Sequence, residues 1–136
     1  AGLNDPFIVG LSCYIWNWEY NKVLARAIKT AFLNCLIVVG GPQIPIRSET
    51  FFREHPYIDL VVHNEGEMSF AEILLELLSV KPDFTKIPGL SVRVDGDETV
   101  KTSPRPRIPD LSVVPSPYLA GVFDELTSLI RDNYDI

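Results

Sequence analysis

The chain has 136 residues, of which 46% are hydrophobic and 22% charged, and its 12 Lys and Arg against 18 Asp and Glu give a net charge of −6. This composition excludes a disordered tail and predicts one domain that is large enough to bury a core. The negative charge argues against a general binder of nucleic acid or anionic membranes, because a phosphate surface would repel the chain. No apolar run approaches the roughly 18–20 residues that a membrane span needs.

Three short apolar runs without alternation predict buried parallel strands, over residues 7–13, 36–39 and 58–62. A helical pattern follows each run: over 18–33, around Phe51 and Phe52, and after Glu67. Three such strand–helix units predict right-handed crossovers and a parallel α/β sheet with helices on both faces.

Caps and apolar stripes define these helices. Asn17 is the expected N-cap of the first helix, and Ser48 can cap the second, which Pro56 ends. The predicted apolar stripes are Val23, Leu24, Ala27, Ile28 and Ala31 in the first helix, and Phe70, Ile73, Leu74, Leu77 and Leu78 in the last.

The pattern changes after Pro82. Leu90, Val92 and Val94 alternate with other residues, and Asp95-Gly96 then turns the chain into residues 99–101, which predicts a β-hairpin. Five prolines between residues 103 and 117 predict an extended linker. A short helix is expected over 122–131.

Cys13 and Cys35 form neither a disulfide framework nor a Cys-x-x-Cys pair, and they are predicted to be inert core thiols. A secretory signal is absent from the sequence, so the reducing cytoplasm is the expected location. The chain has no initiator Met and stops without a closing element, and we therefore expect it to be a piece of a longer protein.

Ligands of open α/β sheets bind beyond the carboxyl ends of the strands, which here are the loops 12–17, 40–47 and 63–67. Gly40-Gly41 either lets a flat group approach the backbone or only makes a tight turn before Pro42. The carboxylates of Glu65 and Glu67 either complement a helix dipole or contact a ligand. The aromatic residues near the first loop either line a pocket or pack in the core: Trp16, Trp18 and Tyr20.

Several common chemistries lack their motifs in this sequence. The Gly-x-Gly-x-x-Gly fingerprint and the phosphate loop ending in Gly-Lys-Ser/Thr are both absent. A flavin site would need several Ser or Thr after the first strand, and only Ser12 is available. His55 and His63 have no ligand cluster around them, so His63 is predicted to be a packed or partly exposed side chain and not a metal ligand.

The segments from Ile8 to Asn17, Ile37 to Pro42 and Asp59 to Glu67, taken together, resemble the N-terminal region of cobalamin-dependent radical SAM proteins. The stretches 87–90 and 110–119 resemble the connection from that region to the radical SAM barrel. The resemblance implies a flavodoxin-like α/β fold, truncated at its N-terminus, that holds cobalamin at the carboxyl edge of its sheet. It divides the chain into a partial cobalamin-binding domain (1–82), a β-hairpin extension (83–102), and a Pro-rich linker with a short helix that leads to the barrel (103–136).

The resemblance also assigns a cofactor-binding role to individual residues. It places Ser12, Gly40, Gly41, Glu65, Gly66 and Glu67 along the nucleotide tail of cobalamin, and Tyr14, Trp16 and Pro42 against the corrin. The Asp-x-His-x-x-Gly motif that supplies the lower cobalt ligand in mutases has no match in this sequence. S-adenosylmethionine and the 4Fe-4S cluster would belong to the downstream barrel, since the Cys-x-x-x-Cys-x-x-Cys motif is also absent.

The predicted function is therefore that of a cobalamin-binding module, itself non-catalytic, which serves a radical SAM barrel in the same polypeptide. The whole enzyme would carry out methyl transfer, or cyclase or redox chemistry as in the magnesium-protoporphyrin cyclase, on a small organic substrate. The alternative is a ligand-free interaction domain of the same fold that forms a homodimer, and a flavin-binding domain is a third possibility.

Overall fold

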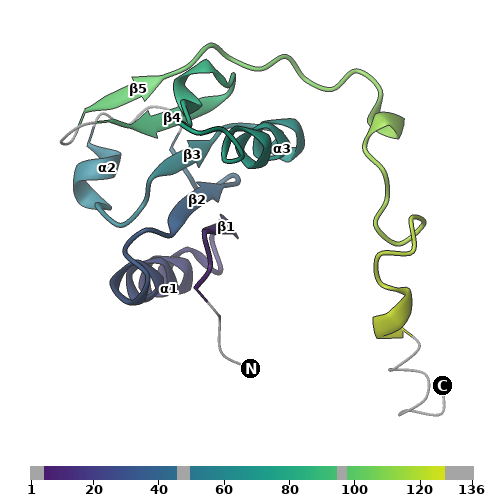
Figure 1. The fold of residues 1–136 in the computed structure, drawn as a ribbon, viewed down its shortest axis with the longest axis horizontal. Coiled ribbons are helices and arrows are strands. Elements are labelled where there is room, and N and C mark those ends of the chain that lie inside the picture. The colour runs from purple at the N-terminus through teal and green to yellow at the C-terminus, as the bar shows by residue number, and fades with distance from the viewer. Residues whose placement is uncertain (1–4, 46–49, 95–97, 128–136) are drawn as a thin grey trace.

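A five-stranded mixed sheet forms the centre of the computed structural model, which describes residues 5–45, 50–94 and 98–127 (Figure 1). The strands are β1 (Ile8–Ser12), β2 (Leu36–Gly40), β3 (Leu60–Val62), β4 (Leu90–Arg93) and β5 (Thr99–Lys101), in that spatial order. The first three are parallel, whereas β4 is antiparallel to both β3 and β5. The predicted parallel strands and β-hairpin therefore join in one sheet.

Helices cover both faces of the sheet, as the sequence predicts. The helices α1 (Trp18–Ala31) and α2 (Phe51–Glu54) pack on one face, and α3 (Glu67–Glu76) packs on the other. Alternation along β2 sends Ile37 and Val39 into the first layer and Val38 into the second. The α/β fold with flanking helices is thus confirmed. No helix in the described part of the chain has both the length and the apolar character needed to cross a bilayer.

The prediction of the buried face of α1 is partly wrong. Val23, Ala27 and Ala31 lie in exposed positions, and Val23 is 65% exposed. Ile28 is buried and Leu24 packs against the core as predicted, but the other buried side chains are Asn21 and Ala25. The buried face includes a polar residue because the Asn21 amide is satisfied there, by donating a hydrogen bond to the Ser12 carbonyl oxygen at 3.0 Å.

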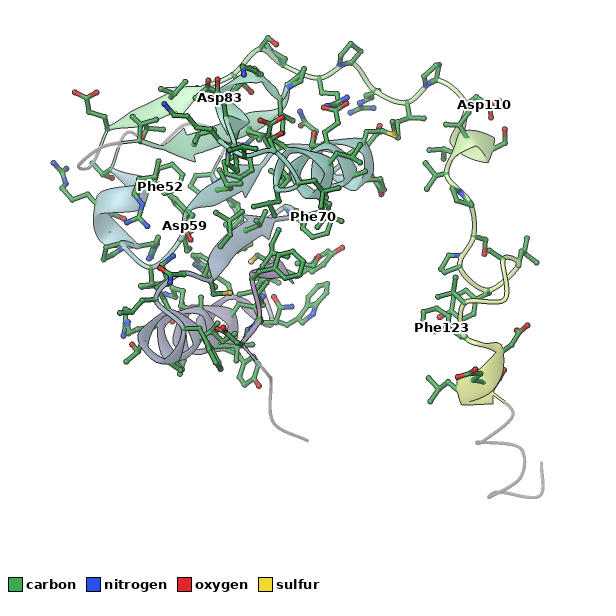
Figure 2. The ribbon with its side chains drawn as sticks, in the orientation of Figure 1. Phe52, Asp59, Phe70, Asp83, Asp110 and Phe123 are labelled. Atoms are coloured by element: carbon green, nitrogen blue, oxygen red, sulfur yellow. The ribbon has the colours of Figure 1, made fainter. Side chains whose placement is uncertain are left out.

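The apolar stripe of α3 is also shorter than predicted. Ile73 is fully buried and Phe70 and Leu77 pack around it, but Leu74 is exposed and Leu78 is 83% exposed. Leu78 faces solvent because the helix ends at Glu76, whose carboxylate accepts a hydrogen bond from the Asp83 N–H at 2.9 Å. Figure 2 shows Phe70 pointing from α3 toward the sheet.

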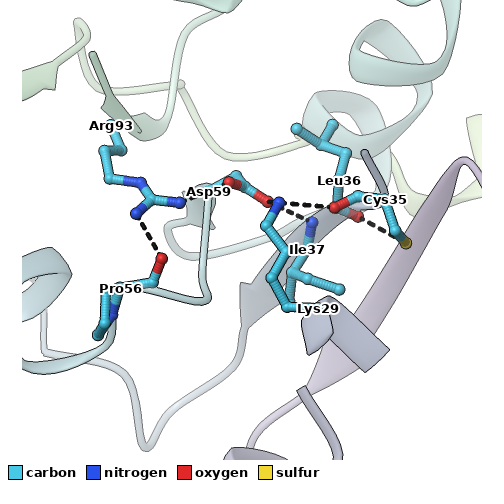
Figure 3. Close-up of polar contacts among 7 residues, drawn as sticks. All are labelled: Lys29, Cys35, Leu36, Ile37, Pro56, Asp59 and Arg93. Atoms are coloured by element: carbon cyan, nitrogen blue, oxygen red, sulfur yellow. Dashed lines mark hydrogen bonds and ion pairs between the residues drawn. The ribbon is translucent and has the colours of Figure 1, made fainter. Parts of the chain in front are cut away.

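A charged cluster around Asp59 joins the elements at the amino end of β3 (Figure 3). Asp59 Oδ2 accepts from Lys29 Nζ at 2.7 Å and from the Ile37 N–H at 2.8 Å, while Oδ1 accepts from the Arg93 guanidinium at 2.7 Å. Arg93 also donates to the Pro56 carbonyl oxygen. One carboxylate therefore links α1, β2 and β4.

The remaining predictions differ in their boundaries. The third strand begins at Leu60, two residues later than predicted. Ser48 and the Asp95-Gly96 turn lie outside the described residues, and of the predicted last helix only residues 124–127 are described as helical. After β5 the chain passes α3 and continues as an arm that carries the single-turn helices near Asp110 and Phe123 (Figure 2). The predicted domain boundaries at 82 and 102 stay predictions.

Candidate cofactor groove

A groove of about 850 Å³ lies at the carboxyl ends of the three parallel strands. The ends of β1, β2 and β3 and the loops that follow them form most of its lining, and Phe70 of α3 and Arg107 complete it. Parallel strands all direct their carboxyl ends to one edge, so three loops that are far apart in sequence meet there. The groove therefore occupies the edge at which the sequence predicts a ligand.

Eight of the nine predicted site residues line this groove: Ser12, Tyr14, Gly40, Gly41, Pro42, Glu65, Gly66 and Glu67. Trp16 is not in the lining. Its ring stacks on that of Tyr14, with centroids 4.8 Å apart and planes 9° apart, and 77% of the residue is exposed. The structure thus brings eight of these residues together and leaves Trp16 at the rim, behind Tyr14. Their role toward a ligand stays a prediction.

The other aromatic residues of the first loop have separate positions. Trp18 packs in the core, with its ring centroid 5.3 Å from that of His55 and 6.2 Å from that of Phe51. Tyr20 is 68% exposed on α1. The core interpretation therefore holds for Trp18 alone.

The glycine pair after β2 is needed for the turn itself. Gly41 has a φ of +107°, and a Cβ at this position would lie 2.6 Å from the Cys13 carbonyl oxygen. A Cβ on Gly40 would lie 3.3 Å from the Val62 carbonyl oxygen. Both glycines line the groove, but Gly41 is required first by the close approach of two backbone segments.

Part of the groove floor was not predicted from the sequence. Gly10 lines the groove, and a Cβ on it would lie 3.1 Å from the Phe70 ring. A Cβ on Gly66 would lie 3.3 Å from a methyl group of Val62, which also lines the groove. Bare backbone thus sits directly against Phe70 and Val62. The signal that could have identified Gly10 is a glycine inside an otherwise apolar strand.

The first loop is held in place by two asparagines. Asn17 Oδ1 accepts from the Tyr14 N–H at 2.7 Å, and Asn17 Nδ2 and Asn21 Nδ2 both donate to the Ser12 carbonyl oxygen at 3.0 Å. Asn17 occupies the N-cap position of α1, but its side chain makes no capping hydrogen bond to the helix. The predicted N-cap position is therefore confirmed, but the Asn17 side chain fixes the loop that carries Ser12 and Tyr14 and makes no capping bond.

The two carboxylates after β3 have different surroundings. Glu65 is half-buried, and its Oε2 accepts from the Ile108 N–H at 2.9 Å. Glu67 is exposed in the first turn of α3, where the helix dipole favours a negative charge. Glu65 thus binds a distant part of the chain. Neither of the two predicted roles, complementing a helix dipole or contacting a ligand, includes this contact.

Burial shifts the pKa of His63, which lines the groove, and of the two cysteines. His63 is 8% exposed with Nε2 2.8 Å from Ser91 Oγ, which confirms the prediction of a packed side chain. Burial, and then the charge of Lys101, lowers the pKa of His63. Cys13 and Cys35 are buried as predicted, and burial raises the pKa of both thiols.

Arg107, which was not predicted from the sequence, is the only positively charged side chain among the described residues that line the groove.

Comparison with known proteins gives relatives of much greater length. The chain is 45% identical over 131 residues to the 2-(S-pantetheinyl)-carbapenam-3-carboxylate methyltransferase of Streptantibioticus cattleyicolor. It is 43% identical, also over 131 residues, to the cobalamin-dependent radical SAM methyltransferase TokK of Streptomyces tokunonensis. Each alignment covers 96% of this chain but only 19% of the relative, so the chain spans about a fifth of the length of these proteins.

The fold has a counterpart among solved structures. The apo structure of the cobalamin-dependent S-adenosylmethionine radical enzyme OxsB superposes with a TM-score of 0.56 at 25% sequence identity, covering 76% of this chain and 14% of OxsB. The model of the B12 binding domain matches residues 1–74, a range that includes the groove loops after all three parallel strands. More than half of the chain lies within that match, and the chain therefore belongs to the B12-binding domain family.

Proposed function

We propose that the groove binds cobalamin and that the chain acts as the cofactor-binding module of a radical SAM enzyme. The observation that carries this proposal is the meeting of three loops, two of which contain glycine, around one groove at the carboxyl edge of the parallel strands. Membership in the B12-binding domain family supports the same cofactor.

The residues of the groove fit the nucleotide tail of cobalamin in size and character. Cofactor sites have volumes of roughly 300–1,000 Å³ and are mostly apolar with a few polar groups. The volume here is about 850 Å³, and Leu11, Val62 and Phe70 line it together with the hydroxyl-bearing Ser12. A Cβ at Gly10 or Gly66 would crowd the floor, so the absence of side chains at these positions keeps room for a flat aromatic base.

Ser12, Gly40, Gly41 and Gly66 would hold the tail, and Tyr14 and Pro42 would contact the corrin at the loop tips. Trp16 would act through its stack on Tyr14, which keeps that ring in place. When bound, cobalamin supplies the capacity to carry a methyl group. The contribution of this chain is to orient the cofactor and to exclude water from its tail.

We infer further that a radical SAM barrel, which would bind S-adenosylmethionine and a 4Fe-4S cluster, belongs to the same polypeptide. The support is that the chain covers only 19% of two relatives named as methyltransferases, one of them a radical SAM methyltransferase. Methyl transfer to a small organic substrate is the whole-protein activity that these names favour. Buried cysteine thiols are compatible with the proposed cytoplasmic location.

The test is a titration of the full-length protein with hydroxocobalamin, followed by its absorbance spectrum and by co-elution. Ser12 is exposed in the groove, so Ser12→Trp fills the site without replacing a buried residue. We expect this variant to lose cobalamin binding, whereas Ser79→Trp, at an exposed position after α3, keeps it. Failure of the wild-type protein to bind, or equal binding by all three proteins, contradicts the proposal.

A second candidate function is association between two copies through the edge of the sheet. In the part of the chain that the structure describes, β1 is the terminal strand of the sheet, and Tyr20 and Val23 are exposed on the adjacent α1. An unpaired strand edge beside apolar side chains is a favourable surface for pairing. Sedimentation of the full-length protein over a range of concentrations tests it, and a mass that stays monomeric for wild type and Val23→Glu alike rejects this homodimer.

A further inference from the structure

The segment that follows β5, residues 103–108, runs along α3 and is called the strap here. Arg105 Nε donates to Ser69 Oγ at 2.8 Å, and the Arg105 guanidinium also forms an ion pair with Glu72. Ser69 is fully buried and donates in turn to the Pro88 carbonyl oxygen at 3.0 Å. A buried hydroxyl and a carboxylate of α3 thus hold the middle of the strap.

Backbone groups hold the two ends of the strap. The Ser103 carbonyl oxygen accepts from the Gly89 N–H at 2.8 Å, and the Ile108 N–H donates to Glu65 Oε2 at 2.9 Å. Gly89 has a φ of +82°, and a Cβ on it would lie 3.2 Å from Arg105 Cβ, so the strap lies directly against this turn. The strap is therefore a fixed part of the fold and not a free linker.

Arg107 lies between the two anchored positions 105 and 108 and lines the groove. It is exposed and has no ion-pair partner in the part of the chain that the structure describes. The other charged side chains of the groove are the carboxylates of Glu65 and Glu67. A ligand with an anionic group would be repelled by these two, and Arg107 is the group that can offset the repulsion.

We propose that Arg107 binds the phosphodiester of the cobalamin nucleotide tail and that Arg105 is the positioning residue that keeps the strap, and with it Arg107, at the groove. This inference rests on the proposed function. Cobalamin carries one anionic phosphodiester, which joins its nucleotide to a side chain of the corrin. The planar guanidinium group can bind two phosphate oxygens at once, which gives orientation as well as affinity.

The test compares two corrinoids with the full-length protein. Cobinamide has the corrin of cobalamin but lacks the nucleotide and its phosphodiester. We expect Arg107→Ala to weaken the binding of hydroxocobalamin roughly tenfold, the size of one charge-assisted hydrogen bond, and to leave that of diaquacobinamide unchanged. The affinity of Arg107→Lys for hydroxocobalamin should lie between those of the wild type and Arg107→Ala, because lysine keeps the charge but cannot bind two phosphate oxygens at once.

The matched control is Arg53→Ala, which removes the same charge from an exposed position on α2 outside the groove lining, and it should change neither affinity. Equal losses for both corrinoids with Arg107→Ala, or no loss for either, overturn the inference. The proposed function fails separately, if the wild-type protein does not bind hydroxocobalamin or if Ser12→Trp leaves that binding intact.

The role of Arg105 is tested by a double-mutant cycle. If Arg105 acts through Arg107, Arg105→Ala weakens hydroxocobalamin binding but not diaquacobinamide binding, and the double variant binds no more weakly than Arg107→Ala alone. If Arg105→Ala does not fold, Glu72→Gln takes its place, because it keeps the Arg105–Ser69 hydrogen bond but removes the ion pair. We expect this variant to weaken hydroxocobalamin binding less than Arg105→Ala would, and to leave diaquacobinamide binding unchanged. Additive losses in the cycle contradict the positioning role.

Discussion

At the scale of single residues, the glycines of the groove show why a structural need must be separated from a ligand contact. Gly41 has a positive φ, and its Cα faces the Cys13 backbone, so any side chain there strains the turn whether or not a ligand is present. Loss of cobalamin binding after substitution of Gly41 would therefore not identify it as a binding residue. Ser12 is the better probe, because it is exposed and its carbonyl oxygen, not its side chain, receives the bonds from Asn17 and Asn21.

The buried imidazole of His63 predicts how stability depends on pH. Burial and the charge of Lys101 lower the pKa of His63 from its ordinary 6.5, so the folded protein holds the ring neutral while the unfolded chain can protonate it. Its contribution to the free energy of unfolding is therefore complete above pH 6.5 and is lost as the pH falls through 6.5 toward the folded value. We expect stability to decrease from about pH 7 to about pH 5, with a shallower decrease for His63→Gln.

Urea denaturation of the full-length protein at several pH values measures this dependence. His55 is the matched comparison, since burial also lowers its pKa, followed by the charge of Lys22. His55→Gln should remove only its own share of the slope and leave that of His63. Identical slopes for wild type and His63→Gln would show that His63 does not contribute.

At the scale of elements, Asp59 joins parts of the chain that no local pattern connects. Its carboxylate accepts from Lys29 of α1 and Arg93 of β4, and its own side chain is 18% exposed. Asp59→Ala leaves both cations without this partner in a largely buried place, so we expect a loss of about 3 kcal/mol in the free energy of unfolding. Thermal or chemical denaturation measures the loss.

The control for Asp59 is Glu19→Ala, which removes the exposed partner of Lys22 on α1 and should cost at most about 1 kcal/mol. Asp59 precedes β3 and is not in the groove lining, so the folded fraction of Asp59→Ala should bind hydroxocobalamin with unchanged affinity. Similar stability losses for both variants would contradict the structural role that we give to Asp59.

The elements themselves were largely predictable from sequence, because apolar runs and helical spacing are local signals. The three parallel strands, the helices after them and the hairpin all appear where those patterns occur. The buried face of α1 was only partly predictable, because it includes Asn21. A hydrophobic pattern assigns this polar residue to the surface, but it is buried and donates a hydrogen bond to the Ser12 carbonyl oxygen.

The candidate site was predictable only where it follows a strand end. Ser12 and Gly40 end β1 and β2, Glu65 lies in the loop after β3, and topology alone brings them to one edge. Arg107 could not be found in this way. It reaches the groove because the strap is bound to α3 through Arg105, a contact across 36 residues of sequence that leaves no local pattern.

At the scale of the whole molecule, the two ends of the sheet have different roles. The end that contains Asp59 is tied together by charged side chains, and the opposite end carries the glycine-containing loops and the strap. The charged cluster joins the elements at one end of the sheet, while bare backbone lines the groove at the other. Binding of cobalamin should therefore protect backbone amides from hydrogen exchange at the groove end of the sheet only, beyond its effect on global stability.

Hydrogen exchange of the full-length protein with and without hydroxocobalamin tests this polarity. A ligand that binds only the folded state, at about 100 times its Kd, adds about 2.7 kcal/mol of stability, and the segments that it contacts are slowed further. We expect extra protection in the loops 12–17, 40–45 and 63–67 and in the strap, and no local change beyond the global effect at residues 56–59. Diaquacobinamide is the control ligand. It should protect the loops 12–17 and 40–45, which carry the corrin contacts Tyr14 and Pro42, but neither the loop 63–67 nor the strap, because it lacks the nucleotide and the phosphodiester that Arg107 would bind. Protection centred on residues 81–86, or spread evenly over the chain, would mean that the cofactor does not lie in the groove.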